Sequence, residues 1–74
     1  MEKREIKIHT EFITFANLLK LAGIIQTGGQ VIEFIEEENA TLNGVLIFEK
    51  RKKIRPGDVV NIDNKVEITV KEEE

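Results

Sequence analysis

Hydrophobic positions along the chain follow two different periods, which separate a helical segment from β-rich segments. Near the start, Ile6 and Ile8 alternate with charged or polar neighbours, the period-two pattern of a short, half-buried strand. Between residues 14 and 37 the apolar positions recur three or four residues apart, as they do along one face of a helix. From Asn39 onward the pattern returns to that of strands. This order of periods predicts an α+β fold.

The first predicted helix begins after Thr14, whose hydroxyl can accept a hydrogen bond from the free N–H groups of the first turn. Its buried face carries apolar residues at positions i, i+3, i+4 and i+7: Phe15, Leu18, Leu19 and Ala22. Gly23 follows, and glycine most readily adopts the left-handed conformation found just past a helix end. We therefore expect the helix to stop there.

A second short helix is predicted after a corner at residues 24–25. The segment Thr27-Gly28-Gly29-Gln30 fits a capping box, in which the threonine side chain bonds forward and the glutamine side chain reaches back. We expect this helix to end near Glu37 and to bury three apolar residues: Val31, Phe34 and Ile35. Its exposed face then carries four glutamates: Glu33, Glu36, Glu37 and Glu38.

The remaining apolar segments predict four further strands, at residues 40–42, 45–48, 59–62 and 66–70. Asn43-Gly44 is a strong hairpin signal because both residues tolerate positive φ. Turns are also expected at residues 56–58 and 63–64, and the acidic end, residues 71–74, is expected to be frayed. The prediction is a single domain over residues 1–74, with its core at about 5–70. Two short helices pack on one side of a small, mostly antiparallel sheet of four to five strands.

Size and composition narrow the class of protein. A chain of 74 residues has no room for a second core. It contains no cysteine, which excludes a disulfide framework and a Cys-ligated zinc site. No apolar run approaches the ~20 residues of a membrane span. We therefore expect a cytoplasmic monomer that has no membrane partner and needs no cofactor or metal.

The charge distribution is more informative than its sum. A net charge of −3 argues by itself against nucleic-acid binding. The acidic residues, however, crowd the second helix and the C-terminal end, whereas five of the six residues from Lys50 to Arg55 are basic. Such a run can contact phosphates, but it can also be a solvated loop that blunts a sheet edge. The residues alone leave both interpretations open.

No pattern indicates catalysis. His9 is the only histidine, so it has no partner for a metal site or for a nucleophile–base pair. The adjacent glutamates of the second helix resemble a solvated face, because glycoside hydrolysis needs two carboxylates held across a cleft. Phe12 and Phe48 are either packing residues or platforms for an unpaired base. We therefore expect a protein that is not an enzyme.

Several short motifs occur in a specific order over residues 13–60. They are Ile13-Thr14-Phe15, Leu18-Leu19-Lys20-Leu21-Ala22, Ile24-Ile25-Gln26-Thr27-Gly28-Gly29, Leu42-Asn43-Gly44, Lys53-Ile54 and Gly57-Asp58-Val59-Val60. Together they resemble the alpha-L RNA-binding domain, also called the S-four domain, and within it the short stand-alone bacterial YaaA type. The resemblance implies RNA binding, usually of ribosomal or other structured RNA, by the helix–corner–helix with the hairpin beside it.

Position by position, the resemblance assigns RNA contacts to a lysine of the first helix, the corner, the hairpin asparagine and the basic loop. These residues are Lys20, Thr27, Gly28, Gly29, Asn43, Lys50, Arg51, Lys52 and Lys53. We add Arg55, which belongs to the same basic run. Gln26 and Gln30 complete the set, because their amides can hydrogen-bond to base edges or 2′-hydroxyls. The resulting hypothesis is a non-catalytic RNA-binding module.

An alternative is a protein-interaction module that keeps the fold, has lost RNA binding and has a ribosomal or other protein partner. Ile32 stands where lysine is usual in the subfamily, the second helix is acidic, and residues 45–48 form an apolar run. A ubiquitin-like sulfur carrier would also be small and α+β, but it needs a Gly-Gly C-terminus. This chain ends in Lys71-Glu72-Glu73-Glu74.

Overall fold

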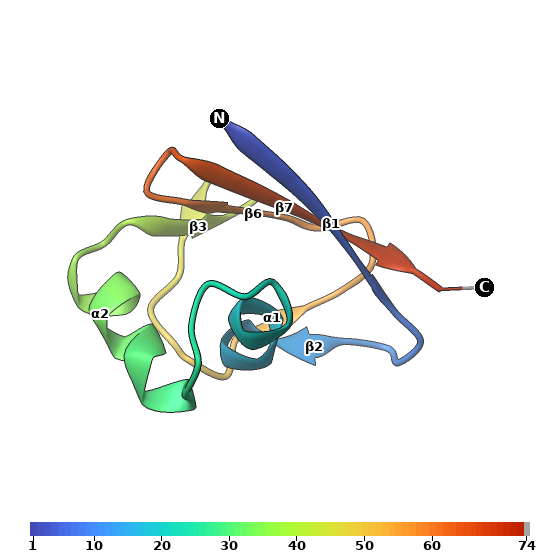
Figure 1. Cartoon of the computed structure of the whole chain (residues 1–74), viewed down its shortest axis with the longest axis horizontal. Coiled ribbons are helices and arrows are strands. Elements are labelled where there is room, and N and C mark those ends of the chain that lie inside the picture. Colours follow the sequence, from blue (N-terminus) through green and yellow to red (C-terminus); the bar gives the residue numbers. More distant parts are fainter. Residues whose placement is uncertain (74) are drawn as a thin grey trace.

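The two longest strands come from opposite ends of the chain and lie side by side (Figure 1). The computed structural model describes residues 1–73 and pairs β1 (Glu2–Ile8) in parallel with β7 (Val66–Glu72). The prediction of a frayed end is therefore wrong for residues 71–73, because Lys71 and Glu72 belong to β7 and the Glu73 N–H donates to the Ile8 carbonyl at 2.7 Å. The backbone of β1 supplies the partners that hold this acidic segment. Glu74, the last residue of the predicted tail, lies outside the described residues.

The main sheet has five strands in the order β1-β7-β6-β3-β4. Here β6 is Val59–Ile62, β3 is Ala40–Leu42 and β4 is Val45–Leu46, and every neighbouring pair except β1 and β7 is antiparallel. Positive φ values at Asn43, Gly44, Asp63 and Asn64 form two of the three turns that the sequence predicts, and the third, at residues 56–58, has a positive φ at Gly57. The prediction of a small, mostly antiparallel sheet is confirmed.

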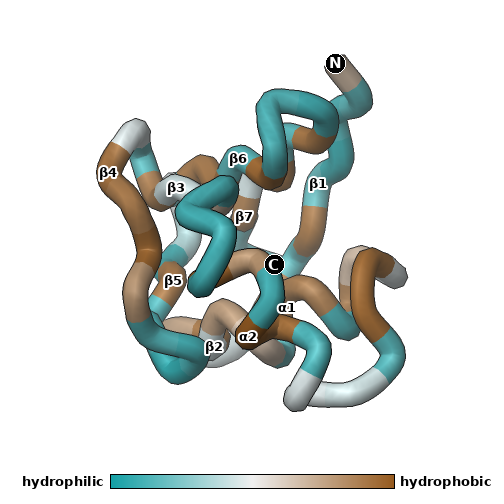
Figure 2. Tube along the Cα trace, turned by 90° about the vertical axis from the view of Figure 1, so that its left-hand side faces the viewer, coloured by the Kyte–Doolittle hydropathy of each residue, from teal (hydrophilic) through white to brown (hydrophobic). Residues whose placement is uncertain are grey.

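The fourth strand is shorter than predicted. It was expected over residues 45–48, but regular pairing stops at Leu46, after which Ile47 turns into the core and Phe48 is left 65% exposed. The apolar run that begins in β4 stands at an outer edge of the molecule (Figure 2). The chain leaves the sheet here because it must cross to the helical side, where the basic residues follow.

A second sheet, which the sequence did not predict, has two strands. It pairs β2 (Ile13–Thr14) antiparallel with β5 (Lys53–Ile54), and the register places Ile13 opposite Ile54. Both isoleucines are buried. The predicted basic loop is therefore partly strand, since Lys53 belongs to β5.

The first helix, α1, spans Phe15–Leu21 and ends as predicted. The Thr14 hydroxyl accepts from the Asn17 N–H at 3.4 Å. At the other end the N–H groups of Gly23 and Ile24 donate to the carbonyls of Lys20 and Leu19, at 3.0 and 2.9 Å. This is a Schellman motif, and its φ of +76° at Gly23 explains the glycine.

The second helical segment begins as a 3₁₀ turn, η1 (Gly28–Gln30), and continues as α2 (Val31–Glu36). Two consecutive glycines are poor helix formers, which fits the irregular start. The predicted capping box is present. Val31 is fully buried, while Phe34 and Ile35 are half-buried against the core.

The helices lie on one face of the main sheet, and the core fills the space between the two layers (Figure 1). Its fully buried side chains come from α1, the small sheet, α2, the main sheet and the segment after β4: Phe15, Leu18, Leu19, Val31, Ile47, Ile54, Val60, Ile68 and Val70. Within residues 1–73, no helix has the length and apolar character needed to cross a membrane. The core consequently fixes α1 and β5 against each other, and both carry predicted RNA-binding residues.

Candidate nucleic-acid interface

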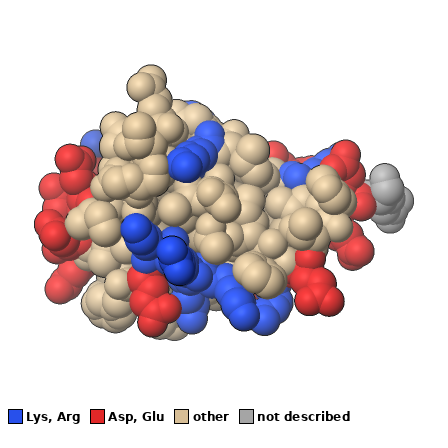
Figure 3. Space-filling view, turned by 90° about the horizontal axis from the view of Figure 1, so that it is seen from below, with Lys and Arg blue, Asp and Glu red and all other residues tan. Residues whose placement is uncertain are grey.

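Four predicted residues from three separate segments surround one surface hollow of about 340 Å³. Lys20 comes from α1, Gly28 from η1, and Lys50 and Arg51 from the segment before β5. We call this feature the cationic hollow; its lining is Thr14, Ala16, Asn17, Lys20, Gly28, Lys50 and Arg51. Seen from the side of the helices, Lys and Arg side chains gather near the lower centre of the face, with one acidic group beside them and the other acidic side chains toward both ends (Figure 3).

The backbone of the basic segment is tied to the start of α1. The Phe15 N–H donates to the Lys52 carbonyl at 2.9 Å, and the Ala16 N–H donates to the Lys50 carbonyl at 3.0 Å. These bonds satisfy two of the N–H groups that a helix N-terminus leaves free. Pairing of β5 with β2 fixes the next residues. The backbone is thus positioned by main-chain bonds, which leaves the basic side chains free to face solvent.

The positive charge at this site is not neutralised within the described chain. Ion pairs involve Lys3, Arg4, Lys65 and Lys71 at other places on the molecule. Within residues 1–73, none involves Lys20 or a basic residue of the 50–55 segment. A cluster of unpaired cations attracts polyanions more strongly than the same number of paired ones. The cationic hollow is therefore lined by cations that have no ion-pair partner among residues 1–73.

Gly28 gives Lys20 room. A Cβ at position 28 would lie 3.8 Å from both Cε and Nζ of Lys20, an ordinary contact distance, and φ at Gly28 is not positive. The backbone therefore does not require glycine here, in contrast to Gly23. The absence of a side chain at Gly28 leaves the Lys20 ammonium more accessible from the hollow.

The rest of the corner is organised by one glutamine. The side-chain oxygen of Gln30 accepts from the N–H groups of Gln26 and Thr27, at 2.6 and 2.9 Å. This acceptor is therefore occupied within the corner. Gln26 and Gly29 are exposed beside it, and Gly29 has open space where a Cβ would lie. The corner stands next to the cationic hollow through Gly28.

Asn43 and Arg55 are not brought into the hollow. The Asn43 side chain donates to the Asp58 carboxylate at 3.1 Å and accepts from the Val59 N–H at 3.0 Å. The same carboxylate accepts from the Arg55 N–H at 2.8 Å. These bonds connect the β3–β4 hairpin to the start of β6. The geometry gives Asn43 a structural task in addition to the RNA contact that the resemblance implies.

The two remaining lysines of the basic segment, Lys52 and Lys53, do not line the cationic hollow. Lys52 borders a hollow beside the hairpin, together with Asn43 and Leu46. The Lys53 ammonium lies 4.9 Å from the ring centroid of Phe12. This is a cation–π contact. The basic side chains therefore spread along the surface from the hairpin to the turn before β2.

Sequence reasoning missed Asn17 and treated Thr14 only as a helix cap. Both line the cationic hollow. Asn17 is exposed and comes directly after Phe15 and Ala16, whose N–H groups donate to carbonyls of the basic segment. The available signal was a polar side chain on the outer face of the first helical turn, near Lys20. This side chain becomes part of a basic surface only when residues 50–53 fold against the first turn of α1.

The resolved pKa shifts lie away from this surface. In β1 the guanidinium of Arg4 donates to the Glu2 carboxylate, which lowers the pKa of Glu2 and raises that of Arg4. Arg4 also donates to the Ala22 carbonyl, so it connects β1 to the end of α1. Within residues 1–73, no group of three or more metal-ligating side chains is present.

Two comparisons place the chain among known proteins. The family model described as "S4 domain" matches residues 6–71. The chain is also 40% identical over 58 residues to the protein named "Probable ribosome maturation protein RlbA" from Bacillus subtilis (strain 168), an alignment that covers 78% of this chain and 82% of that protein. The family match spans both helices, the hairpin and the basic segment. This chain therefore belongs to the S4 domain family.

Proposed function

We propose that this protein is a non-catalytic RNA-binding module that binds ribosomal or other structured RNA in the cytoplasm as a monomer. The cationic hollow carries the proposal: three basic side chains from two segments meet there without an acidic partner in the described chain. Membership of the S4 domain family supports RNA as the polyanion. The name of the Bacillus subtilis relative supports ribosome maturation as the process.

The mechanism is electrostatic positioning. Lys20, Lys50 and Arg51 contact phosphates around the hollow, and Lys52 and Lys53 extend the contact along the backbone of the RNA. Each contact releases condensed counterions, so affinity falls as salt rises. Phosphate contacts fix register and orientation and carry no sequence information themselves. Selectivity then comes from RNA shape and from the polar groups of the corner, including Thr27 and Gln26.

The test is binding to purified ribosomal RNA and to an unrelated structured RNA across a salt series. With about four to five phosphate contacts, the slope of log K against log salt is expected near −3 to −4.5. Tighter binding to ribosomal RNA at the same slope would support recognition of shape. Absence of binding to both RNAs at low salt would refute the proposed function.

A matched control uses lysines that have acidic partners. Lys65 pairs with Asp63 at 3.5 Å, and Lys71 pairs with Glu5 at 3.1 Å. Replacing both with alanine removes two positive charges from β7 and the turn before it. The salt slope should stay as in the wild type. Replacing Lys50 and Arg51 should reduce the magnitude of the slope by about two, because each removes about one phosphate contact.

A protein-interaction module is the second candidate, favoured by Val45 and Phe48, which are both more than 60% exposed. Exposed apolar side chains of this size mark protein contacts when they form a patch. This candidate predicts that Val45 and Phe48 matter and that the basic segment does not. The Lys50 and Arg51 variant therefore separates the two functions.

A further inference from the structure

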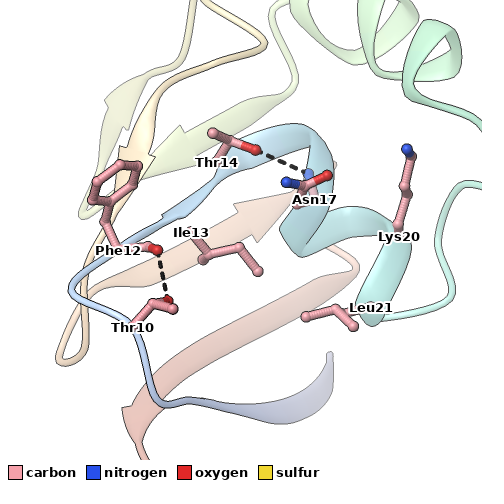
Figure 4. A pocket seen from close by; sticks show the side chains of 7 residues that line it. All are labelled: Thr10, Phe12, Ile13, Thr14, Asn17, Lys20 and Leu21. Carbon is pink, nitrogen blue, oxygen red and sulfur yellow. Dashed lines mark hydrogen bonds between the residues drawn. The ribbon is translucent and has the colours of Figure 1, made fainter.

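A second hollow, of about 470 Å³, lies along the outer side of α1 and continues the cationic hollow. Three residues, Thr14, Asn17 and Lys20, line both hollows, so the two form one continuous surface. Apolar side chains dominate the new part: Phe12 stands at one end, Leu21 at the other, and Ile13 lies between them (Figure 4). We call this part the apolar hollow.

The two apolar ends are exposed although the core lies close by. Phe12 is 37% exposed and Leu21 is 62% exposed, while Phe15 on the opposite side of α1 is fully buried. The Thr10 hydroxyl donates to the Phe12 carbonyl at 2.9 Å, and the Lys53 ammonium lies 4.9 Å from the Phe12 ring centroid. The ring is thus held at the surface by a fixed backbone and a neighbouring cation.

Polar groups at the junction of the hollows suit a nucleobase edge. Asn17 is exposed and offers a donor and an acceptor on one amide, and no side-chain group of residues 1–73 hydrogen-bonds to that amide. Unpaired bases are recognised by stacking on aromatic side chains together with hydrogen bonds to their edges. The apolar hollow provides the first of these interactions and Asn17 provides the second.

We propose that the apolar hollow takes one unpaired nucleobase of the RNA, with the adjoining backbone phosphates held in the cationic hollow. The base stacks on Phe12 and directs its polar edge toward Asn17. This inference rests on the proposed function and deepens it, because it names an unpaired nucleotide as the recognised element. The positive charge on both sides of the apolar hollow, from Lys20 and Lys53, favours a nucleotide over an apolar peptide side chain.

The experiment compares three RNA hairpins of equal length and charge. One is fully paired, one carries a single bulged adenosine, and one carries an abasic site at the bulge. Stacking on an aromatic side chain is worth about 1–3 kcal/mol per base, so the bulged RNA should bind about 5- to 150-fold more tightly than the abasic RNA. A bulged 2-aminopurine should change its fluorescence on binding, because stacking quenches it.

Phe12→Ala should bring the bulged RNA to the affinity of the abasic RNA without changing the salt slope. Phe48→Ala is the matched control, since Phe48 is the other exposed phenylalanine and does not line the apolar hollow. Phe48→Ala should leave the preference for bulged over abasic RNA unchanged. Leu21→Ala, at the other end of the apolar hollow, should also reduce the preference for bulged over abasic RNA. A loss seen in both variants cannot come from a folding defect of the Phe12 variant alone. Circular dichroism establishes that each variant is folded.

The outcomes separate the two proposals. Equal wild-type affinity for bulged and abasic RNA, with the expected salt slope, would overturn the nucleobase site and leave RNA binding standing. Equal weakening of all three RNAs by Phe12→Ala would also overturn it, because the phenylalanine would then act through the fold. No binding to any of the three hairpins at low salt would overturn the nucleobase site, and the ribosomal RNA measurement described above would then decide whether RNA binding itself stands.

Discussion

The two helices lie on the same side of the main sheet and bury similar apolar faces, yet they expose opposite charge (Figures 1 and 3). The outer side of α1 presents Asn17 and Lys20 beside the basic segment. The outer side of α2 and the residues after it present glutamates: Glu33, Glu36, Glu37 and Glu38. The net charge of −3 averages over these two regions and describes neither.

The basic segment and the glutamates of α2 also differ in how they are attached to the rest of the fold. The basic segment is fixed to α1 by the bonds from Phe15 and Ala16 and by the β2–β5 pairing. Glu33 and Glu36 are exposed on α2, and Glu37, just past its end, accepts from the Asn39 side chain. A cluster of like charges attracts ions of the opposite sign and repels ions of its own sign, so the basic segment favours an anionic ligand and the glutamates oppose one. The predictions below test this contrast.

The largest effect is expected from removing the positioned charge. Replacing Lys50, Arg51, Lys52 and Lys53 with alanine should abolish RNA binding at physiological salt and cut the magnitude of the salt slope by about four. The fold should survive, because the bonds to α1 use the carbonyls of Lys50 and Lys52 rather than their side chains. Salt-series binding and circular dichroism measure the two results. Unchanged affinity in a folded variant would refute the electrostatic mechanism.

The next largest effect tests whether Asn43 stabilises the fold or contacts RNA. Asn43→Ala should lower the free energy of unfolding by about 2 kcal/mol, since two side-chain hydrogen bonds are lost and alanine is strained at a φ of +50°. The salt slope of RNA binding should not change. Urea denaturation measures the stability. A loss of affinity at unchanged stability would contradict this interpretation and make Asn43 an RNA contact.

Asn43→Gly is the control for this variant. Glycine removes the same two hydrogen bonds but accepts the positive φ, so it should lose less stability than alanine. The difference between the two variants isolates the backbone strain from the hydrogen bonds.

A smaller effect distinguishes the two glycines on either side of the corner. Gly23→Ala should cost about 1 kcal/mol, because φ is +76° there. Gly28→Ala should change stability by less than about 0.5 kcal/mol, since its φ is ordinary and the new Cβ meets Lys20 at a normal contact distance. Thermal unfolding of both variants gives the comparison. Equal destabilisation would mean that the corner constrains Gly28 as strictly as Gly23.

Local patterns predicted most of the fold. The caps at Thr14 and Gly23 and the turns at Asn43-Gly44 and Asp63-Asn64 are set by neighbouring residues, and each is present. The parallel pairing of β1 with β7 joins residues more than sixty positions apart, so no local pattern reports it. The sequence therefore predicts a frayed tail, although β1 pairs with Lys71 and Glu72 and accepts a hydrogen bond from Glu73.

The candidate site was only partly predictable for the same reason. The basic residues were identified from composition and from the resemblance, but the meeting of Lys20 with Lys50 and Arg51 depends on the two-residue pairing of β2 with β5. Strands this short carry no periodic pattern. Asn17 was missed because its surroundings exist only after that pairing forms.

The smallest expected effect tests whether the acidic helix lies outside the RNA footprint. Replacing Glu33, Glu36, Glu37 and Glu38 with glutamine removes four negative charges and leaves the shape of the surface nearly unchanged. At 0.15 M salt the screening length is about 8 Å, so the RNA affinity should rise by less than about twofold. At 0.01 M it is about 30 Å, and the rise should reach several-fold. An increase above tenfold at 0.15 M salt would show that RNA passes directly over α2, because only charges within about one screening length act strongly there. The contrast between the helices would then describe two parts of one binding surface.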